Sequence, residues 1–119
     1  MAEGESAPLG GEQRRALLVL GYLFLRMGQF TRAKKLFTAL LALDSDDAWA
    51  RRCLAAALLA LGDGASALEH INKGMGTTPP SSRDAALYLL KARALWLTGR
   101  ADEAKNAVNA WLAAGGGRL

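Results

Sequence analysis

The chain has 119 residues, of which 51% are hydrophobic, 7% aromatic and 22% charged, with a formal net charge of +4. This length favours one domain with a modest core, and a small net charge without a run of like charges argues against nucleic-acid binding. A single cysteine, Cys53, excludes an intramolecular disulfide and is typical of a reducing compartment. Ala and Leu supply most of the apolar residues, β-branched residues are scarce, and the three prolines lie at positions 8, 79 and 80. We therefore expect an all-α fold.

In chain order, the first expected segment is a disordered leader, residues 1–11, which has little apolar content. A single domain over residues 12–114 should follow, with helices at about 13–26, 30–43, 47–60, 64–75, 84–98 and 101–113. Asp46 or Asp47 can cap the third helix and Ser82 the fifth. Residues 115–119 should form a flexible tail, because three glycines end the last helix.

The first helix contains an apolar run, Ala16 to Leu25, with no charge in ten residues. A membrane-spanning helix needs about 20 apolar residues, so this run predicts a buried helix. The leader is acidic, whereas a secretory signal begins with basic residues. We therefore expect a protein that stays in the cytoplasm and does not insert into a membrane.

The chain repeats itself. The segments LRMGQFTRAKKLF (25–37), ALGDGASALEHI (60–71) and LTGRADEAKNAV (97–108) align, with Gly28, Gly62 and Gly99 at one position and Ala33, Ala67 and Ala104 at another. The first two units are 34 residues apart and the next two 37, with the extra residues in the loop 77–83. Thirty-four residues is the period of the tetratricopeptide repeat, a helix–turn–helix unit that stacks into a solenoid. The sequence therefore predicts three stacked hairpins, at about 14–47, 48–81 and 85–114.

The first unit carries the motif most fully. Leu17, Leu20, Gly21 and Phe24 follow the W-x-x-L-G-x-x-Y line of this repeat, with Leu for Trp and Phe for Tyr. Gly21 would allow close approach of the second helix, and Phe37 would fill the gap between units. A generic six-helix bundle is the alternative.

The first helices of such repeats line a concave groove. Its expected positions are Arg15, Leu18, Tyr22, Leu25, Trp49, Arg52, Ala56, Leu59, Leu89, Arg93 and Trp96. Aromatic, Leu and Arg side chains on a face that should otherwise be polar indicate a binding surface. Alternatively, the curvature of the solenoid covers Leu18 and Leu25. A possible second interface lies at the end of the sixth helix, with Val108, Trp111 and Leu112, unless Trp111 packs back on the fifth helix.

The sequence shows no arrangement of residues that is typical of a catalytic or metal-binding site. His70 has no second His or Cys at ligand spacing, so we expect it at the surface or packed within its hairpin. Cys53 is expected to be a buried structural thiol. Asp44–Asp47 resembles the start of a calcium loop but lacks its later Gly and Glu, and is interpreted as a turn with a cap. We expect no catalytic residues, no metal, no cofactor and no enzymatic activity.

The chain resembles the small tetratricopeptide chaperones of bacterial type III secretion, in particular the YscY-type (SctY-like) export chaperones. The resemblance covers residues 14–113 and rests on LGYLFLRMGQFTRA, ALLALDSDDAWARRCLAAALLA and ALWLTGRADEAKNA. It implies a cytoplasmic chaperone that holds a small secreted, YscX-type protein in a heterodimer, and a pair that engages the export-gate protein. The groove residues would then cover apolar surface of the partner.

Three alternatives stay open. The needle-subunit co-chaperone of the same systems is also a short three-repeat protein. A self-associating scaffold subunit would form a homo-oligomer through the groove or the Trp111 end. A nucleic-acid adaptor would use the cations Arg14, Arg15, Arg26, Arg32, Lys34 and Lys35, although a solvated helix face explains them more simply.

Overall fold

The structure, a computed structural model, describes residues 10–75 and 85–113. Within these residues the chain forms α2 (Gly11–Arg26), α3 (Phe30–Leu43), α4 (Ala48–Ala60), α5 (Gly64–Met75), α6 (Ala85–Leu97) and α7 (Ala101–Ala113), and no strand. Each bound lies within two residues of the one expected, and the all-α fold is confirmed. Most of the expected leader, the loop that contains Ser82 and the tail 115–119 lie outside the described residues.

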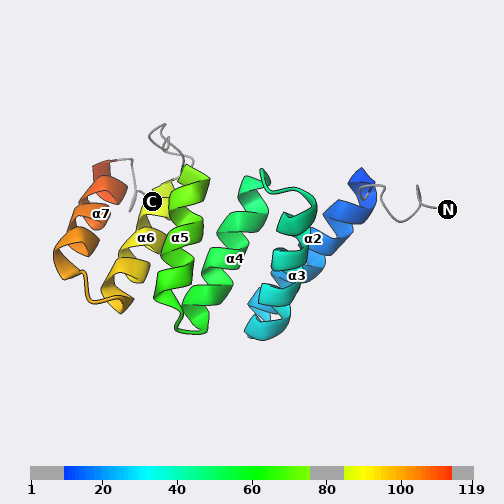
Figure 1. Ribbon diagram of the computed structural model, residues 1–119, viewed down its shortest axis with the longest axis horizontal. Helices are drawn as coiled ribbons and strands as arrows, with labels where there is room; N and C mark the ends of the chain where they lie inside the picture. The colour runs from blue at the N-terminus through cyan, green and yellow to red at the C-terminus, as the bar shows by residue number, and fades with distance from the viewer. Residues whose placement is uncertain (1–9, 76–84, 114–119) are drawn as a thin grey trace.

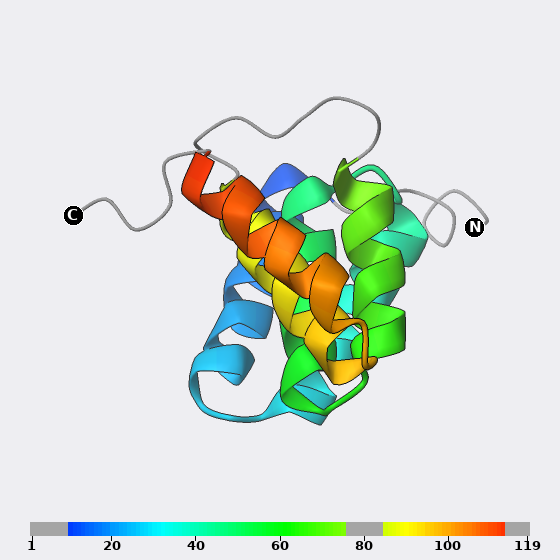
Figure 2. The ribbon, with the colours of Figure 1, turned by 90° about the vertical axis from the view of Figure 1, so that its left-hand side faces the viewer.

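The helices form a row of three antiparallel hairpins, α2–α3, α4–α5 and α6–α7 (Figure 1). The molecule is elongated, with extents of 53 × 27 × 27 Å. Consecutive helices pack on one another, and α4 also contacts both α2 and α6. Seen from the end of the row, α7 and α6 face the viewer and the earlier hairpins lie behind them (Figure 2). The first helices of the hairpins therefore lie side by side, as in a short solenoid.

All three hairpin turns use the same backbone device. Gly28, Gly62 and Gly99 have φ angles of 75°, 82° and 78°, in the left-handed region that favours glycine. After each glycine the next N–H donates back to a carbonyl near the helix end, as from Gln29 to Phe24 (2.8 Å). A glycine in the left-handed region together with this backbone hydrogen bond is the Schellman motif. It ends the first helix and reverses the chain at the same place in every repeat.

Glycine also permits close helix packing at two points. A Cβ at Gly21 would lie 2.6 Å from the ring of Phe37, so the absence of a side chain lets α3 approach α2. Phe37 is fully buried, and its ring meets that of Trp49 on α4 edge-on, with 6.2 Å between centroids. Gly64 plays a similar part between α5 and α6, where a Cβ would lie 2.8 Å from that of Leu97. The expected roles of Gly21 and Phe37 are both confirmed.

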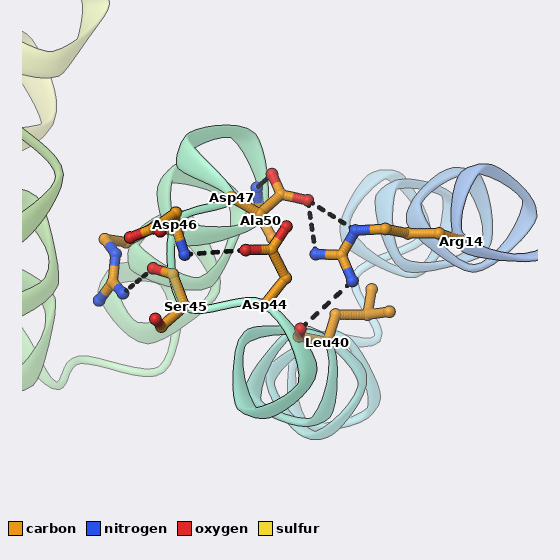
Figure 3. Close-up of polar contacts among 8 residues, drawn as sticks. Arg14, Leu40, Asp44, Ser45, Asp46, Asp47 and Ala50 are labelled. Atoms are coloured by element: carbon orange, nitrogen blue, oxygen red, sulfur yellow. Dashed lines mark hydrogen bonds and ion pairs between the residues drawn. The ribbon is translucent and has the colours of Figure 1, made fainter. Parts of the chain in front are cut away.

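Arg14 and Asp47 join the first hairpin to the second (Figure 3). Asp47 caps α4 by accepting a hydrogen bond from the Ala50 N–H (2.9 Å), as expected for one of the two candidate caps. Its other oxygen accepts bonds from Arg14 Nε (3.0 Å) and Nη2 (2.6 Å), and Arg14 Nη1 also donates to the Leu40 carbonyl (3.4 Å). The Asp47 carboxylate thus caps helix α4 and also binds Arg14 of α2.

The environment of Asp47 favours its charged form. Burial alone would raise the pKa of Asp47, but the Ala50 N–H and the Arg14 guanidinium outweigh it and hold the pKa below its ordinary value of 3.8. A carboxylate whose pKa is lower in the folded state stabilises the fold above its unfolded pKa. That stability is lost as the pH falls through the lower, folded pKa.

We expect Asp47→Asn to lower the free energy of unfolding at pH 7 by about 2 kcal/mol, because the neutral amide still caps α4 but no longer offers a charged acceptor to Arg14. The difference from wild type should persist down to about pH 4 and shrink below it, as Asp47 of the wild type becomes protonated. Urea unfolding monitored by circular dichroism between pH 2.5 and 7 measures this. Asp46→Asn, at an exposed neighbouring position, is the control and should cost little. A difference that stays constant to pH 2.5 would contradict the role given to the charge.

Gly21→Ala should destabilise the protein by about 2 kcal/mol, because the new methyl group would overlap the buried Phe37 ring. Gly11→Ala, where no atom lies within 4 Å of the new Cβ, is the matched control on the same helix. Thermal unfolding of both variants tests the packing. Equal midpoints would show that α2 and α3 are not held this closely.

Candidate partner-binding surface

The first helices α2, α4 and α6 present a row of exposed apolar side chains. Tyr22 of α2 and Trp49 of α4 lie against each other, with ring centroids 6.2 Å apart. Trp49 keeps 38% of its surface exposed and Trp96 of α6 keeps 69%, while Leu89 is also exposed. Large apolar side chains left in water on neighbouring helices are typical of a surface that binds another molecule. We call these four residues, Tyr22, Trp49, Leu89 and Trp96, the inner row.

The other expected groove residues differ in exposure. Arg15 and Arg93 are exposed, and Leu18, Leu25, Arg52 and Ala56 are half-buried. Leu18 and Leu25 pack against the core, which agrees with the alternative that the solenoid itself covers them. Leu59 is only 3% exposed, because α6 packs over that part of α4.

A cavity of about 770 Å³ lies at the C-terminal end of this face. Its lining brings together Leu59, Leu89, Arg93 and Trp96, which the groove pattern indicates, and Val108 of α7, expected in a second interface. The cavity lining also includes Leu97, Asp102, Ala104 and Lys105. The two expected surfaces therefore meet in one place. We call this the end cavity.

The remaining residues of the expected second interface lie further along α7. Leu112 is exposed and Trp111 is half-buried. The intermediate exposure of Trp111 leaves both expectations for this residue in place.

An apolar face that the sequence analysis did not single out lies on α2. Val19, Leu20, Leu23 and Met27 are all exposed, although Leu20 belongs to the repeat motif. The positions 34 residues after Val19, Leu20 and Leu23 are buried in α4, as Cys53, Leu54 and Ala57, whereas Leu61, 34 residues after Met27, is also exposed. The α4 residues are buried because the first hairpin packs against α4. No described residue covers the corresponding side of α2. Comparing α2 with α4 position by position would have revealed this face.

The cations of the first hairpin do not form one uniform group. Arg14 is engaged by Asp47 and is mostly buried, so the interpretation of Arg14 as part of a solvated or nucleic-acid-binding face is wrong. Arg15, Arg26, Arg32, Lys34 and Lys35 are exposed.

His70 and Cys53, both on the second hairpin, have surroundings that fit a structural role. Arg51 Nη1 donates to His70 Nδ1 (3.1 Å), which ties α4 to α5 within one hairpin. Desolvation and the Arg51 charge both lower the pKa of His70, which favours the neutral ring. Cys53 is buried as expected, and desolvation raises the pKa of its thiol to about 11. A neutral thiol at cellular pH is a poor nucleophile.

The described residues contain no group of three or more His, Cys, Asp or Glu side chains placed to hold a metal ion. In the same part of the chain, none of the helices has both the length and the apolar character required to cross a bilayer.

Comparison with known proteins adds two findings. The chain resembles the solved structure of the Yersinia enterocolitica type III secretion translocator chaperone SycD (alternative dimer), with a TM-score of 0.75 and 22% identity. The match covers 86% of this chain and 75% of that one, and at this identity it shows a shared fold. No curated protein matches significantly. The family model of the tetratricopeptide repeat matches residues 24–83, half of the chain, and the chain therefore belongs to the tetratricopeptide repeat family.

Proposed function

We propose that the protein is a cytoplasmic chaperone of a bacterial type III secretion system, which binds a small secreted partner and delivers it for export. The observation that carries this proposal is the inner row, where two tryptophans, a tyrosine and a leucine lie exposed on neighbouring helices. The likeness in fold to a translocator chaperone supports the same class of function.

The proposed mechanism is binding without catalysis. A secreted protein must be kept from folding or aggregating before export, and its apolar segments need cover from water. Aromatic side chains that are already exposed and held by packed helices can provide this cover with little loss of their own freedom. Because the partner binds only the folded chaperone, each chain stabilises the other by mass action.

The finer assignment follows the resemblance to the YscY-type chaperones. In this proposal the partner is a YscX-type protein, the complex is a heterodimer, and the pair also contacts the export-gate protein. A needle-subunit co-chaperone of the same systems remains the alternative within this class.

A self-associating scaffold is a second candidate, and one observation favours it. Val19, Leu20, Leu23 and Met27 form an exposed apolar stripe on α2, outside the inner row. A second copy of the chain that covered this stripe would bury surface that the described residues leave in water.

We expect Trp96→Asp and Tyr22→Ala each to weaken binding of a YscX-type partner at least tenfold, because each removes an aromatic anchor of the inner row. Co-expression followed by pull-down and isothermal titration measures the loss. Helical content should change little, since Trp96 is 69% exposed.

Leu43→Asp is the matched control, because Leu43 is also a large exposed apolar residue but lies at the end of the second helix α3. Its affinity for the partner should equal that of wild type. If both inner-row variants bind like wild type, the inner row is not the binding surface. If the wild-type chain forms no complex with any YscX-type protein, the proposed partner is wrong.

A further inference from the structure

The first two hairpins each receive the first helix of the next hairpin on one face. Helix α4 packs on α2–α3 and α6 packs on α4–α5, so this type of junction occurs twice within the described residues. At the first junction Phe37 is fully buried beside Trp49, and at the second the equivalent Ile71 is 2% exposed. The chain thus contains its own templates for how a helix docks on a hairpin.

The last hairpin presents the same face with no described helix on it. Val108, which is equivalent to Phe37 and Ile71, is half-buried and lines the end cavity. Leu112 is 53% exposed, whereas the equivalent Leu41 of the first hairpin is 8% exposed. The end cavity of about 770 Å³ therefore occupies the place where a next first helix would lie.

We propose that the end cavity binds an amphipathic helix of another protein, carrying acidic side chains at its margin, in the position of a fourth repeat's first helix. The proposal rests on the proposed function only for the source of that helix, which would be the secreted partner. The docking position of the helix is inferred from the two internal junctions alone.

We infer the acidic side chains of the bound helix from the charges around the end cavity. Arg93 and Lys105 line it and make no ion pair with a described residue, and Asp102 is the one acid in the lining. At the first junction the positions of Arg93 and Lys105 are held by Tyr22 and Lys34. There Tyr22 meets Trp49. The Ser66 N–H, and more weakly Lys34, lower the pKa of Asp63, which places an acid of the docked hairpin near Lys34.

The helix α2 of a second copy fits these charges poorly. By the 34-residue repeat, Arg15 of α2 corresponds to Trp49 and would lie beside Arg93 of the receiving copy. Gln29 corresponds to Asp63 and would leave Lys105 without an acid. Like charges at the same contact disfavour this occupant. An acidic residue at the Trp49 position and another after the helix end would satisfy both cations.

A pair of peptides tests the proposal. Both have the sequence of residues 47–63 of this chain with Cys53→Ala, and they differ only at position 49, as Trp49→Glu or Trp49→Arg. Each ends in the acid of Asp63, which should lie near Lys105. Fluorescence anisotropy with the labelled peptides and the full chain measures the two dissociation constants.

We expect the Glu peptide to bind about tenfold more tightly than the Arg peptide, and this preference to shrink in 1 M salt. In the Arg93→Glu chain the preference should reverse. Lys91→Glu is the control on the same helix, since Lys91 does not line the end cavity, and its chain should keep the wild-type preference.

Three results would overturn the proposal: equal binding of the two peptides, a preference unchanged by Arg93→Glu, or no binding of either at millimolar concentration. Light scattering adds a fourth. If the chain alone assembles, and both Leu20→Glu and Val108→Glu abolish the assembly, a second copy is the occupant instead. None of these measurements uses the secreted partner, so their failure is distinguishable from failure of the proposed function.

Discussion

The structure depends on one packing constraint: a hairpin of two helices cannot bury both of its apolar faces by itself. Each repeat must lay its first helix on the repeat before it and receive the next one on its other side. Within the chain this is achieved by close approach at Gly21 and Gly64, by Phe37 between α2, α3 and α4, and by the Arg14–Asp47 contact. At the two ends of the row the described residues leave the corresponding faces uncovered, the outer face of α2 and the receiving face of α6–α7.

The same constraint explains how a small all-α chain presents the surface that we propose for binding. The junctions hold α2, α4 and α6 side by side, so the residues on their common face have fixed positions before a partner arrives. Tyr22 and Trp49 come from different repeats and are brought together only by stacking. An aromatic surface held in place by packing loses little conformational freedom on binding, which suits the chaperone function that we propose.

The repeat spacing and its motif were enough to predict the helices, the three glycine turns and the separate packing roles of Gly21 and Phe37, because these features recur at a fixed spacing. The sequence did not predict the partner of Arg14, since the contact with Asp47 joins residues 33 apart across two hairpins. Nor did it predict the exposure of Leu20 or the burial of Leu59. Both have the residue type of their repeat position, but their environment depends on whether a neighbouring repeat lies over them. Position in the row, which a single unit does not encode, decides these cases.

The inner row is the surface that we propose for partner binding, and the three tryptophans at positions 49, 96 and 111 allow this to be measured residue by residue. Fluorine-labelled tryptophan gives one NMR signal for each, which single Trp→Phe variants assign. On addition of a YscX-type partner, we expect the signals of Trp49 and Trp96 to shift together and to saturate at a one-to-one ratio. A complex that forms while both of these signals stay unchanged would contradict it.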